Sequence, residues 1–245
     1  MEHAGTDAII SLAGFRVTST LLATLVVDAV ILLLVFGVRR RLALVPGKLQ
    51  GVAEAVIEYL HTTTEQVAGA RAPKIFPWVA VFFLYIAISN LVGLIPGFTT
   101  VGFHRGDRFV PLLVVSTSDL NLTLALAVVS VVATNVLAIR VVGVRMYLKR
   151  FFALNPLLLF VGLLELLQEM TKFITFSFRL YGNISAGELV LGTLPTLSVI
   201  AAFVVPVPFL ALEILVAVIQ GMIFALLTMA FMTILTEPHE KEGDH

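Results

Sequence analysis

The chain has 245 residues, of which 59% are hydrophobic and only 13% charged, with a formal net charge of zero. A soluble domain carries roughly 45–50% apolar and about 25% charged residues, so this composition excludes an ordinary soluble protein. The balanced charge argues against a nucleic-acid partner. The absence of cysteine excludes a disulfide framework, a cysteine-bound zinc site and a thiol nucleophile.

The apolar residues fall in long runs that predict membrane-spanning helices. Asp, Glu, Lys and Arg are all missing from residues 75–103, 120–139, 189–212 and 214–236. A bilayer core about 30 Å thick needs roughly 20 apolar residues in a helix, and each run is long enough. The polar start, residues 1–16, has no basic region before an apolar stretch, so we expect no cleaved signal peptide.

We therefore expect an all-α membrane protein, residues 1–245 forming a single membrane domain with five transmembrane helices and one amphipathic surface helix. The surface helix is predicted because apolar residues at helical spacing alternate there with glutamates, too often interrupted to span a bilayer. In chain order we expect a first span (17–38), the surface helix (49–68), a second span (75–96), a polar loop (97–108), a third span (111–139), two long tilted helices (154–194 and 208–236) and a polar tail (237–245).

Basic residues predict the orientation of these helices, because they collect in cytoplasmic loops. Clusters at residues 39–41 and 140–150 both follow odd-numbered spans, which places them on one side. If that side is cytoplasmic, the N-terminus lies outside and the C-terminal tail inside. Arg105 and Arg108 then lie outside, partly offset by Asp107.

Ionisable residues inside the predicted spans are functional candidates, because each costs roughly 2.5–3.5 kcal/mol to insert. At 100° per residue, one face of the helix at 154–194 carries a polar stripe, and Glu188 points almost the opposite way. Such a helix would be about 55–60 Å long, so it must tilt strongly to stay in a bilayer. The stripe consists of Glu165, Glu169, Lys172, Arg179 and Asn183; the other candidates are Asp28, Asp119, Glu213 and Gln220.

Arg179 gives the sharpest hypothesis among them. Arginine stays protonated at physiological pH, and no acid lies within seven residues of it on its own helix. Such a fixed cation needs a carboxylate partner from outside its own helix, either from another part of the chain or from another subunit. By contrast, Glu165, Glu169 and Lys172 fit a structural ion-pair cluster near the cytoplasmic surface as well as they fit a functional site. Glu213 and Gln220, seven residues apart, share one helix face.

Five segments together resemble subunit a of the rotary F-type ATP synthase, over about residues 17–236. The strongest stretch, FRLYGNISAGE at 178–188, looks like that family's arginine-containing signature. The others follow in the family's order: VPGK at 45–48, SNLVGLIP at 89–96, STSDLN at 116–121 and IQGMIF at 219–224.

The resemblance implies proton translocation through two half-channels at the interface with a rotating ring of c subunits, coupled to ATP synthesis or hydrolysis. It implies that Arg179 faces the ring and separates the half-channels, with Asn183 and Gln220 as polar neighbours. It also implies that Glu188 and Glu213 relay protons in the outer half-channel. At the position of Glu213 many bacterial relatives carry histidine.

The resemblance also has implications for further polar residues, for the partner subunits and for the membrane. By resemblance, Asp119 and Asn121 form a polar wall or a packing contact near the outer channel, and Glu165 and Lys172 lie near the inner one. The implied partners are the c ring, b-type peripheral stalk subunits and the lipid bilayer of a bacterial or organellar energy-transducing membrane. No cofactor, metal or catalytic residue is implied, so the chain is not an enzyme by itself.

Two other classes of function fit the sequence less well. A secondary transporter should show repeated halves with broken helices in matching positions, and none are visible in the sequence. A non-conducting membrane scaffold would not need the row of intramembrane charges. The sequence also lacks a Gly-x-x-x-x-Gly-Lys phosphate-binding loop, so nucleotide chemistry must belong to other subunits. Both H⁺ and Na⁺ are compatible with this sequence, because the choice of ion depends mainly on the ring.

Overall fold

The computed structural model is mostly helical. It describes residues 8–12, 15–40, 42–95, 98, 101–105, 108–114, 119–151 and 206–237, with single positions at 167, 171, 174, 178 and 182. Within these residues, four stretches are long and apolar enough to cross a membrane. They are Ser19–Arg40, Lys48–Gly93, Asn121–Val142 and Leu210–Leu235. The expected long helix at 154–194 falls almost wholly outside the described residues, so the count of five spans and the tilted hairpin stay predictions.

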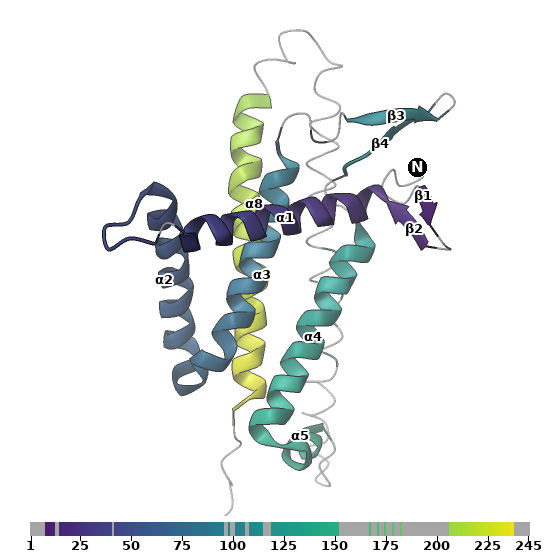
Figure 1. Ribbon diagram of the computed structural model, residues 1–245. Coiled ribbons are helices and arrows are strands. Elements are labelled where there is room, and N and C mark those ends of the chain that lie inside the picture. Colours follow the sequence, from purple (N-terminus) through teal and green to yellow (C-terminus); the bar gives the residue numbers. More distant parts are fainter. Residues whose placement is uncertain are drawn as a thin grey trace, which may run out of the picture.

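The centre of the molecule is a pair of antiparallel helices, α3 (Ala72–Gly93) and α8 (Pro206–Leu235). They run side by side, with α2 (Lys48–Ala68) and α4 (Leu120–Val142) flanking them and α1 (Ser19–Arg40) crossing the bundle (Figure 1). Their shared core contains aliphatic and methionine side chains from both helices. It includes Ile75, Val79, Ala87, Ala225, Met229 and Met232, all at most 5% exposed.

Helices α3 and α8 approach closely at Gly221. A Cβ atom built there would lie 3.2 Å from the Phe83 carbonyl oxygen and the Ala87 nitrogen, and 3.3 Å from the Ala87 Cβ. The two backbones can approach this closely only because residue 221 has no side chain. In lipid, where no hydrophobic force pulls helices together, small residues that permit such approach drive helix association.

The helix at 48–68 packs differently from the expectation for a surface helix. Its apolar stripe divides: Leu60 is fully buried and Val56 packs on the α3–α8 core, whereas Leu49, Val52 and Val67 are 47–66% exposed. Because α2 turns back along α3 (Figure 1), half of its stripe serves the chain's own core. Only the other half remains available to a membrane surface.

The turns at both ends of α2 are built by specific residues. At its start, the buried side chain of Gln50 accepts a hydrogen bond from the Ala43 N–H (3.1 Å) and donates one to the Ala43 carbonyl (2.9 Å). At its end, Gly69 adopts φ 55°, ψ −128°, a conformation open almost only to glycine. The short 3₁₀ turn η1 (Gly69–Arg71) then leads into α3.

The third expected span, 111–139, begins later than predicted. Helix α4 starts at Leu120, because Asp119 forms its N-cap: the carboxylate accepts hydrogen bonds from the Asn121 N–H (2.8 Å) and side-chain amide (3.1 Å). The helix ends at Gly143, whose φ of 89° stops it, and the short basic helix α5 (Val144–Phe151) follows. The Tyr147 hydroxyl of α5 donates to the Asn135 side-chain oxygen and ties α5 back to α4.

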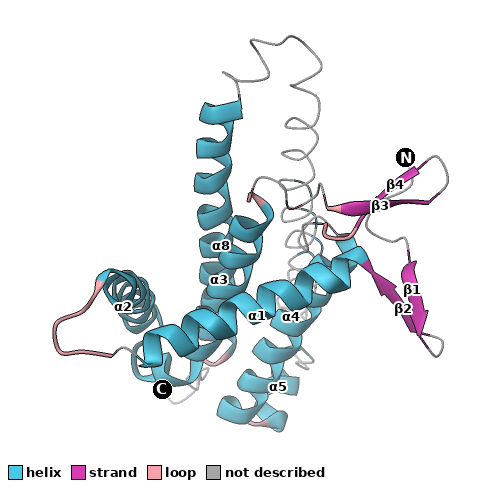
Figure 2. Cartoon of the chain, turned by 45° about the horizontal axis from the view of Figure 1, so that its top comes forward, coloured by secondary structure: helices cyan, strands magenta, loops and turns pink. Residues whose placement is uncertain are grey.

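Two small antiparallel hairpins were not predicted: one covers part of the polar start and the first residues of the expected first span, and the other covers part of the expected polar loop at 97–108 and reaches Pro111. Strands β1 (Ala8–Leu12) and β2 (Phe15–Thr18) precede α1, and strands β3 (Gly102–Arg105) and β4 (Arg108–Pro111) connect α3 to α4. Figure 2 shows both hairpins beside the start of α1. The Ser19 hydroxyl donates to the Pro111 carbonyl (2.6 Å), which joins α1 to the second hairpin.

The N-cap at Asp119 can be separated from a role of its charge, because asparagine caps helices about as well as aspartate. Asp119→Ala should lower the stability of the first turn of α4 by about 1 kcal/mol, whereas Asp119→Asn should retain it. Hydrogen exchange of the backbone amides at 121–124 in the assembled complex measures this difference. Exchange in the alanine variant at the wild-type rate would contradict a stabilising cap.

Candidate functional site

Helix α8 carries two of the predicted site residues on one face. It is helical throughout Pro206–Leu235, so the seven-residue spacing of Glu213 and Gln220 does place them on the same side, two turns apart. Glu213 is half-buried near the start of the helix, and Gln220 is buried at 4% exposure. A carboxylate and an amide thus follow one line down a helix that is otherwise almost wholly apolar.

The contact at Gly221 determines which residues of α3 lie level with the stretch from Glu213 to Gln220. Because α3 and α8 are antiparallel and Phe83 and Ala87 meet Gly221, Ser89 and Asn90 lie between the levels of Gln220 and Glu213. Both side chains are 1% exposed, and the Ser89 hydroxyl has no hydrogen-bond partner among the described residues. Buried polar groups in a bilayer are costly, so their gathering at one level of the bundle marks it as a candidate site.

Helix α4 adds further polar groups. A buried hydrogen bond of 2.9 Å joins the hydroxyls of Ser130 and Thr228, and α4 runs parallel to α8 (Figure 1). Asn121 precedes Ser130 by nine residues on α4, and Ile219 precedes Thr228 by nine residues on α8. Asn121 is therefore at about the level of Ile219, the sequence neighbour of Gln220. Four predicted residues, Asp119 and Asn121 on α4 and Glu213 and Gln220 on α8, therefore lie toward the end of the bundle nearest the β3–β4 hairpin, with Asn121 exposed.

The other predicted site residues are not among those that the structure describes. They are Arg179, Asn183, Glu188, Glu165, Glu169 and Lys172. Five positions between them are helical and exposed, and the Thr171 hydroxyl donates to the Leu167 carbonyl one turn earlier (2.8 Å). At 100° per residue, these positions share a face opposite the predicted polar stripe: Leu167, Thr171, Ile174, Phe178 and Gly182.

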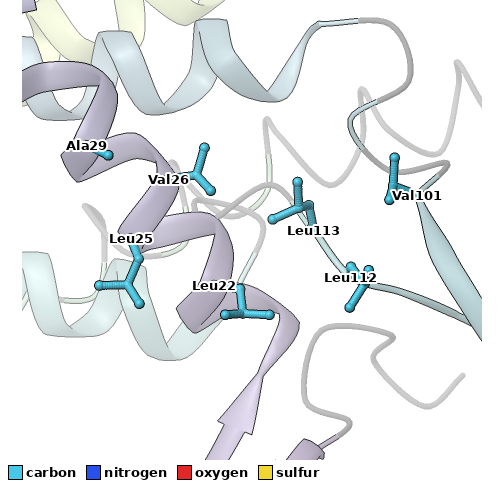
Figure 3. Close-up of a pocket in the computed structure, with 7 residues that line it drawn as sticks. All are labelled: Leu22, Leu25, Val26, Ala29, Val101, Leu112 and Leu113. Carbon is cyan, nitrogen blue, oxygen red and sulfur yellow. The ribbon is translucent and has the colours of Figure 1, made fainter. Parts of the chain in front are cut away.

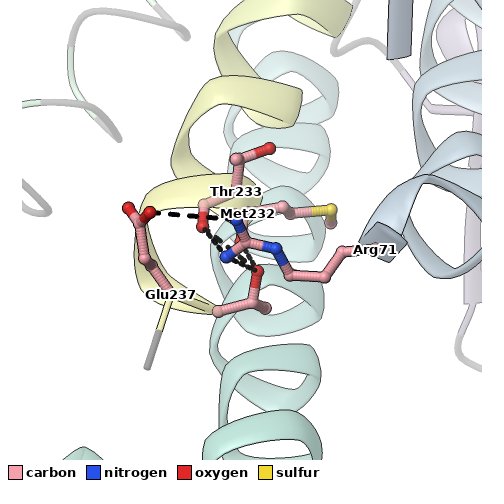
Figure 4. Close-up of polar contacts among 5 residues, drawn as sticks. Arg71, Met232, Thr233 and Glu237 are labelled. Atoms are coloured by element: carbon pink, nitrogen blue, oxygen red, sulfur yellow. Dashed lines mark hydrogen bonds and ion pairs between the residues drawn. The ribbon is translucent and has the colours of Figure 1, made fainter. Parts of the chain in front are cut away.

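Two polar contacts were not predicted from the sequence. In the first, the Tyr85 side chain on α3 is hydrogen-bonded to Thr24 on α1 and interacts electrostatically with Asp28, one turn further along α1. This contact gives Asp28, which had no expected role, a neighbour at the crossing of α1 and α3. In the second, Arg71 in the turn before α3 binds the end of α8 (Figure 4). Neither leaves a local sequence signal, because each joins residues far apart in the chain.

A hollow beside α1 is apolar and takes no part in this polar arrangement. It has a volume of about 410 Å³ and lies between α1 and the segments flanking the β3–β4 hairpin (Figure 3). Its lining is entirely aliphatic, so it offers no group that could bind or relay an ion. The lining residues are Leu22, Leu25, Val26, Ala29, Val101, Leu112 and Leu113.

Comparison with known proteins gives one consistent family. The family model described as "ATP synthase A chain" matches residues 19–233. "ATP synthase subunit a" of Moorella thermoacetica is 28% identical over 98% of this chain and 100% of its own length. "ATP synthase subunit a" of Legionella pneumophila is 29% identical over 94% of this chain and 91% of its own length.

"ATP synthase subunit a 3" of Pelobacter propionicus is 33% identical over 85% of this chain and 83% of its own length. The matched region includes the polar line on α8, the cap of α4 and the signature around Arg179. Because the family model and these relatives cover nearly the whole chain, the chain belongs to the ATP synthase subunit a family.

Proposed function

We propose that this chain conducts protons along two half-channels at its interface with a rotating c ring, as the stationary partner in ATP synthesis and hydrolysis. The observation that carries the proposal is the polar line on α8, Glu213 and Gln220, inside a chain of this family. Titratable and amide side chains have a high free-energy cost in a bilayer, and a proton relay is a function that requires them.

Arg179 is the residue on which this proposal depends most. A permanent cation facing the ring stabilises a deprotonated ring carboxylate, and so promotes proton release from it. The same charge repels a proton that would pass directly from one half-channel to the other. Asn183 and Gln220 would act as polar neighbours of the guanidinium. Glu188 and Glu213 would pass protons between water and the ring.

The remaining residues have assisting roles in the proposal. Asp119 and Asn121 would line the outer half-channel beside Glu213, in addition to the N-cap that they form. Glu165, Glu169 and Lys172 would lie toward the inner half-channel. The long helix at 154–194 and α8 together would form the tilted hairpin that follows the curve of the ring, which makes five spans in all. Stalk subunits of the b type would hold this chain against rotation.

Replacing Arg179 tests the proposal directly. Arg179→Ala should reduce ATP-driven proton pumping to background, because no fixed cation would then promote proton release from the ring carboxyl group. Arg179→Lys should also fail in large part, since a buried ammonium can lose its proton. Pumping is measured by acidification of inverted membrane vesicles, normalised to assembled complex. Arg145→Ala, which removes an exposed guanidinium from α5, is the matched control and should pump normally; normal pumping by Arg179→Ala would refute the proposal.

Glu213 can be tested as a relay separately from the arginine. Glu213→Gln keeps the size and hydrogen bonding of the side chain but cannot carry a proton, so proton flux should fall several-fold while the complex still assembles. Glu213→His introduces a group that titrates near pH 6.5, and flux should persist with a changed pH dependence. Glu58→Gln on the exposed side of α2 is the control. A relay role is excluded if Glu213→Gln conducts like the wild type at every pH.

The proposed orientation places the N-terminus outside and the C-terminal tail in the cytoplasm. The Ser19–Pro111 hydrogen bond supports a common side for the start of α1 and the α3–α4 connection. The basic clusters, which collect in cytoplasmic loops, make that common side the outer one. Since the chain has no cysteine, introduced cysteines report sidedness. Ala4→Cys and Val101→Cys should react with an impermeant thiol reagent outside intact cells, and Met146→Cys and Glu242→Cys only in inverted vesicles. Outside labelling at position 242 would overturn the orientation.

A further inference from the structure

The guanidinium of Arg71 closes the C-terminal end of α8 from a different part of the chain. Its Nη1 donates to the Thr233 carbonyl (3.0 Å) and lies 3.5 Å from the Thr236 hydroxyl (Figure 4). Its Nη2 is 4.0 Å from the Glu237 carboxylate. The Thr236 hydroxyl itself donates to the Met232 carbonyl (2.6 Å), so it can accept from the arginine. Arg71 is about three-quarters buried, and Thr236 is fully buried.

Helix α8 needs such a partner because its own sequence provides none. The last carbonyls of a helix have no intrahelical donor, and they form the negative end of the helix dipole. The last turn of α8 contains no basic residue. A guanidinium donating to one of these carbonyls makes a charge-assisted hydrogen bond and places a cation at the negative helix end. The exposed Glu237 carboxylate, at 4.0 Å, contributes little by comparison.

The backbone before Arg71 is shaped to deliver it. Gly69, with φ 55° and ψ −128°, reverses the chain between α2 and α3, and Arg71 ends the 3₁₀ turn that follows. The arginine thus belongs to the rigid junction of two packed helices and not to a free loop. A contact made from this junction can hold α8 against movement.

The same two helices have a second close contact about three turns away, at Gly221 against Phe83 and Ala87. The apolar core between these two contacts packs α8 on α3, and the contacts at its two ends fix the rotation of α8 and its position along α3. Gln220 is adjacent to Gly221, and Glu213 lies two turns beyond. We infer that Arg71 is a positioning residue of the proton path, which holds the end of α8 and thereby sets where Glu213 and Gln220 lie. This inference rests on the proposed function of those two residues.

The test compares Arg71→Met, which keeps the aliphatic stem but removes the charge and donors, with Arg71→Lys, which restores one charged donor. Lys74→Met removes another basic, exposed side chain from the first turn of α3 and is the matched control. Two readouts are taken from the assembled complex. The first is the distance between spin labels at exposed positions Val81 and Ile234, and the second is ATP-driven proton pumping per assembled complex.

We expect Arg71→Met to shift or broaden the distance distribution and to lower pumping per complex several-fold, Arg71→Lys to restore much of both, and Lys74→Met to change neither. Unchanged distances in Arg71→Met would overturn the inference. So would a variant that assembles poorly but pumps normally per complex, because Arg71 would then serve stability alone. If Arg71→Met does not assemble, Thr236→Val, which removes one acceptor of the arginine, must show a smaller shift of the same kind or the inference fails.

The distance readout separates this inference from the proposed function. It requires no proton flux, so a shift in α8 would stand even if Glu213→Gln pumped normally and the relay role were excluded. Conversely, loss of flux in Glu213→Gln together with unchanged distances in Arg71→Met would keep the proposed function and reject Arg71 as its positioning residue.

Discussion

The close approach of α3 and α8 at Gly221 is the contact on which the rest of the structure depends. With a side chain at this position the helices would stand further apart, since its first carbon already meets backbone atoms of Phe83 and Ala87 at 3.2 Å. Between Gly221 and the C-terminal end of α8, the core of methionine and aliphatic residues fills the space between the helices. Toward the N-terminal end of α8 lie the buried Ser89, Asn90 and Gln220. One glycine thus sets the spacing of the two helices on both sides of the contact.

The predicted site residues that the structure describes are placed by backbone geometry. Asp119 and Asn121 are placed by the N-cap of α4, and α4 is registered on α8 by the Ser130–Thr228 hydrogen bond. Glu213 and Gln220 are placed by the unbroken helix of α8. Since helices in lipid gain little from apolar contact with one another, a few hydrogen bonds and close backbone contacts decide their register. Local changes at those points therefore act on the whole polar line.

The sequence predicted what depends on local pattern. Apolar runs predicted α1, α3, α4 and α8, the amphipathic pattern predicted α2, and the seven-residue spacing of Glu213 and Gln220 predicted their shared face. The short basic helix α5 was not predicted. The start of α4 was placed too early, although aspartate before an apolar run is a usable N-cap signal. The hairpins were missed because strands of four or five residues leave too short a pattern.

Contacts between distant residues could not be predicted in this way. Arg71 and Thr233 are 162 residues apart, and only the packing of α2, α3 and α8 brings them together. The same is true of Tyr85 and its partners on α1. Arg179 and the polar stripe around it stay predictions from the sequence and the family, because they lie outside the described residues.

Helix α1 has a consequence for how the molecule is put together in a bilayer. Only 11% of its most apolar window is buried against the rest of the chain, and side chains such as Leu32, Leu33 and Phe36 are more than half exposed. Lipid tails solvate these side chains as well as another helix would, so they give α1 no preferred docking site. Among the described residues, α1 is positioned by hydroxyl groups, Ser19 at Pro111 and Thr24 at Tyr85, and by the small buried face of Ala23 and Val27. Insertion of α1 into the bilayer and its recognition by the bundle are thus encoded by different side chains of one helix.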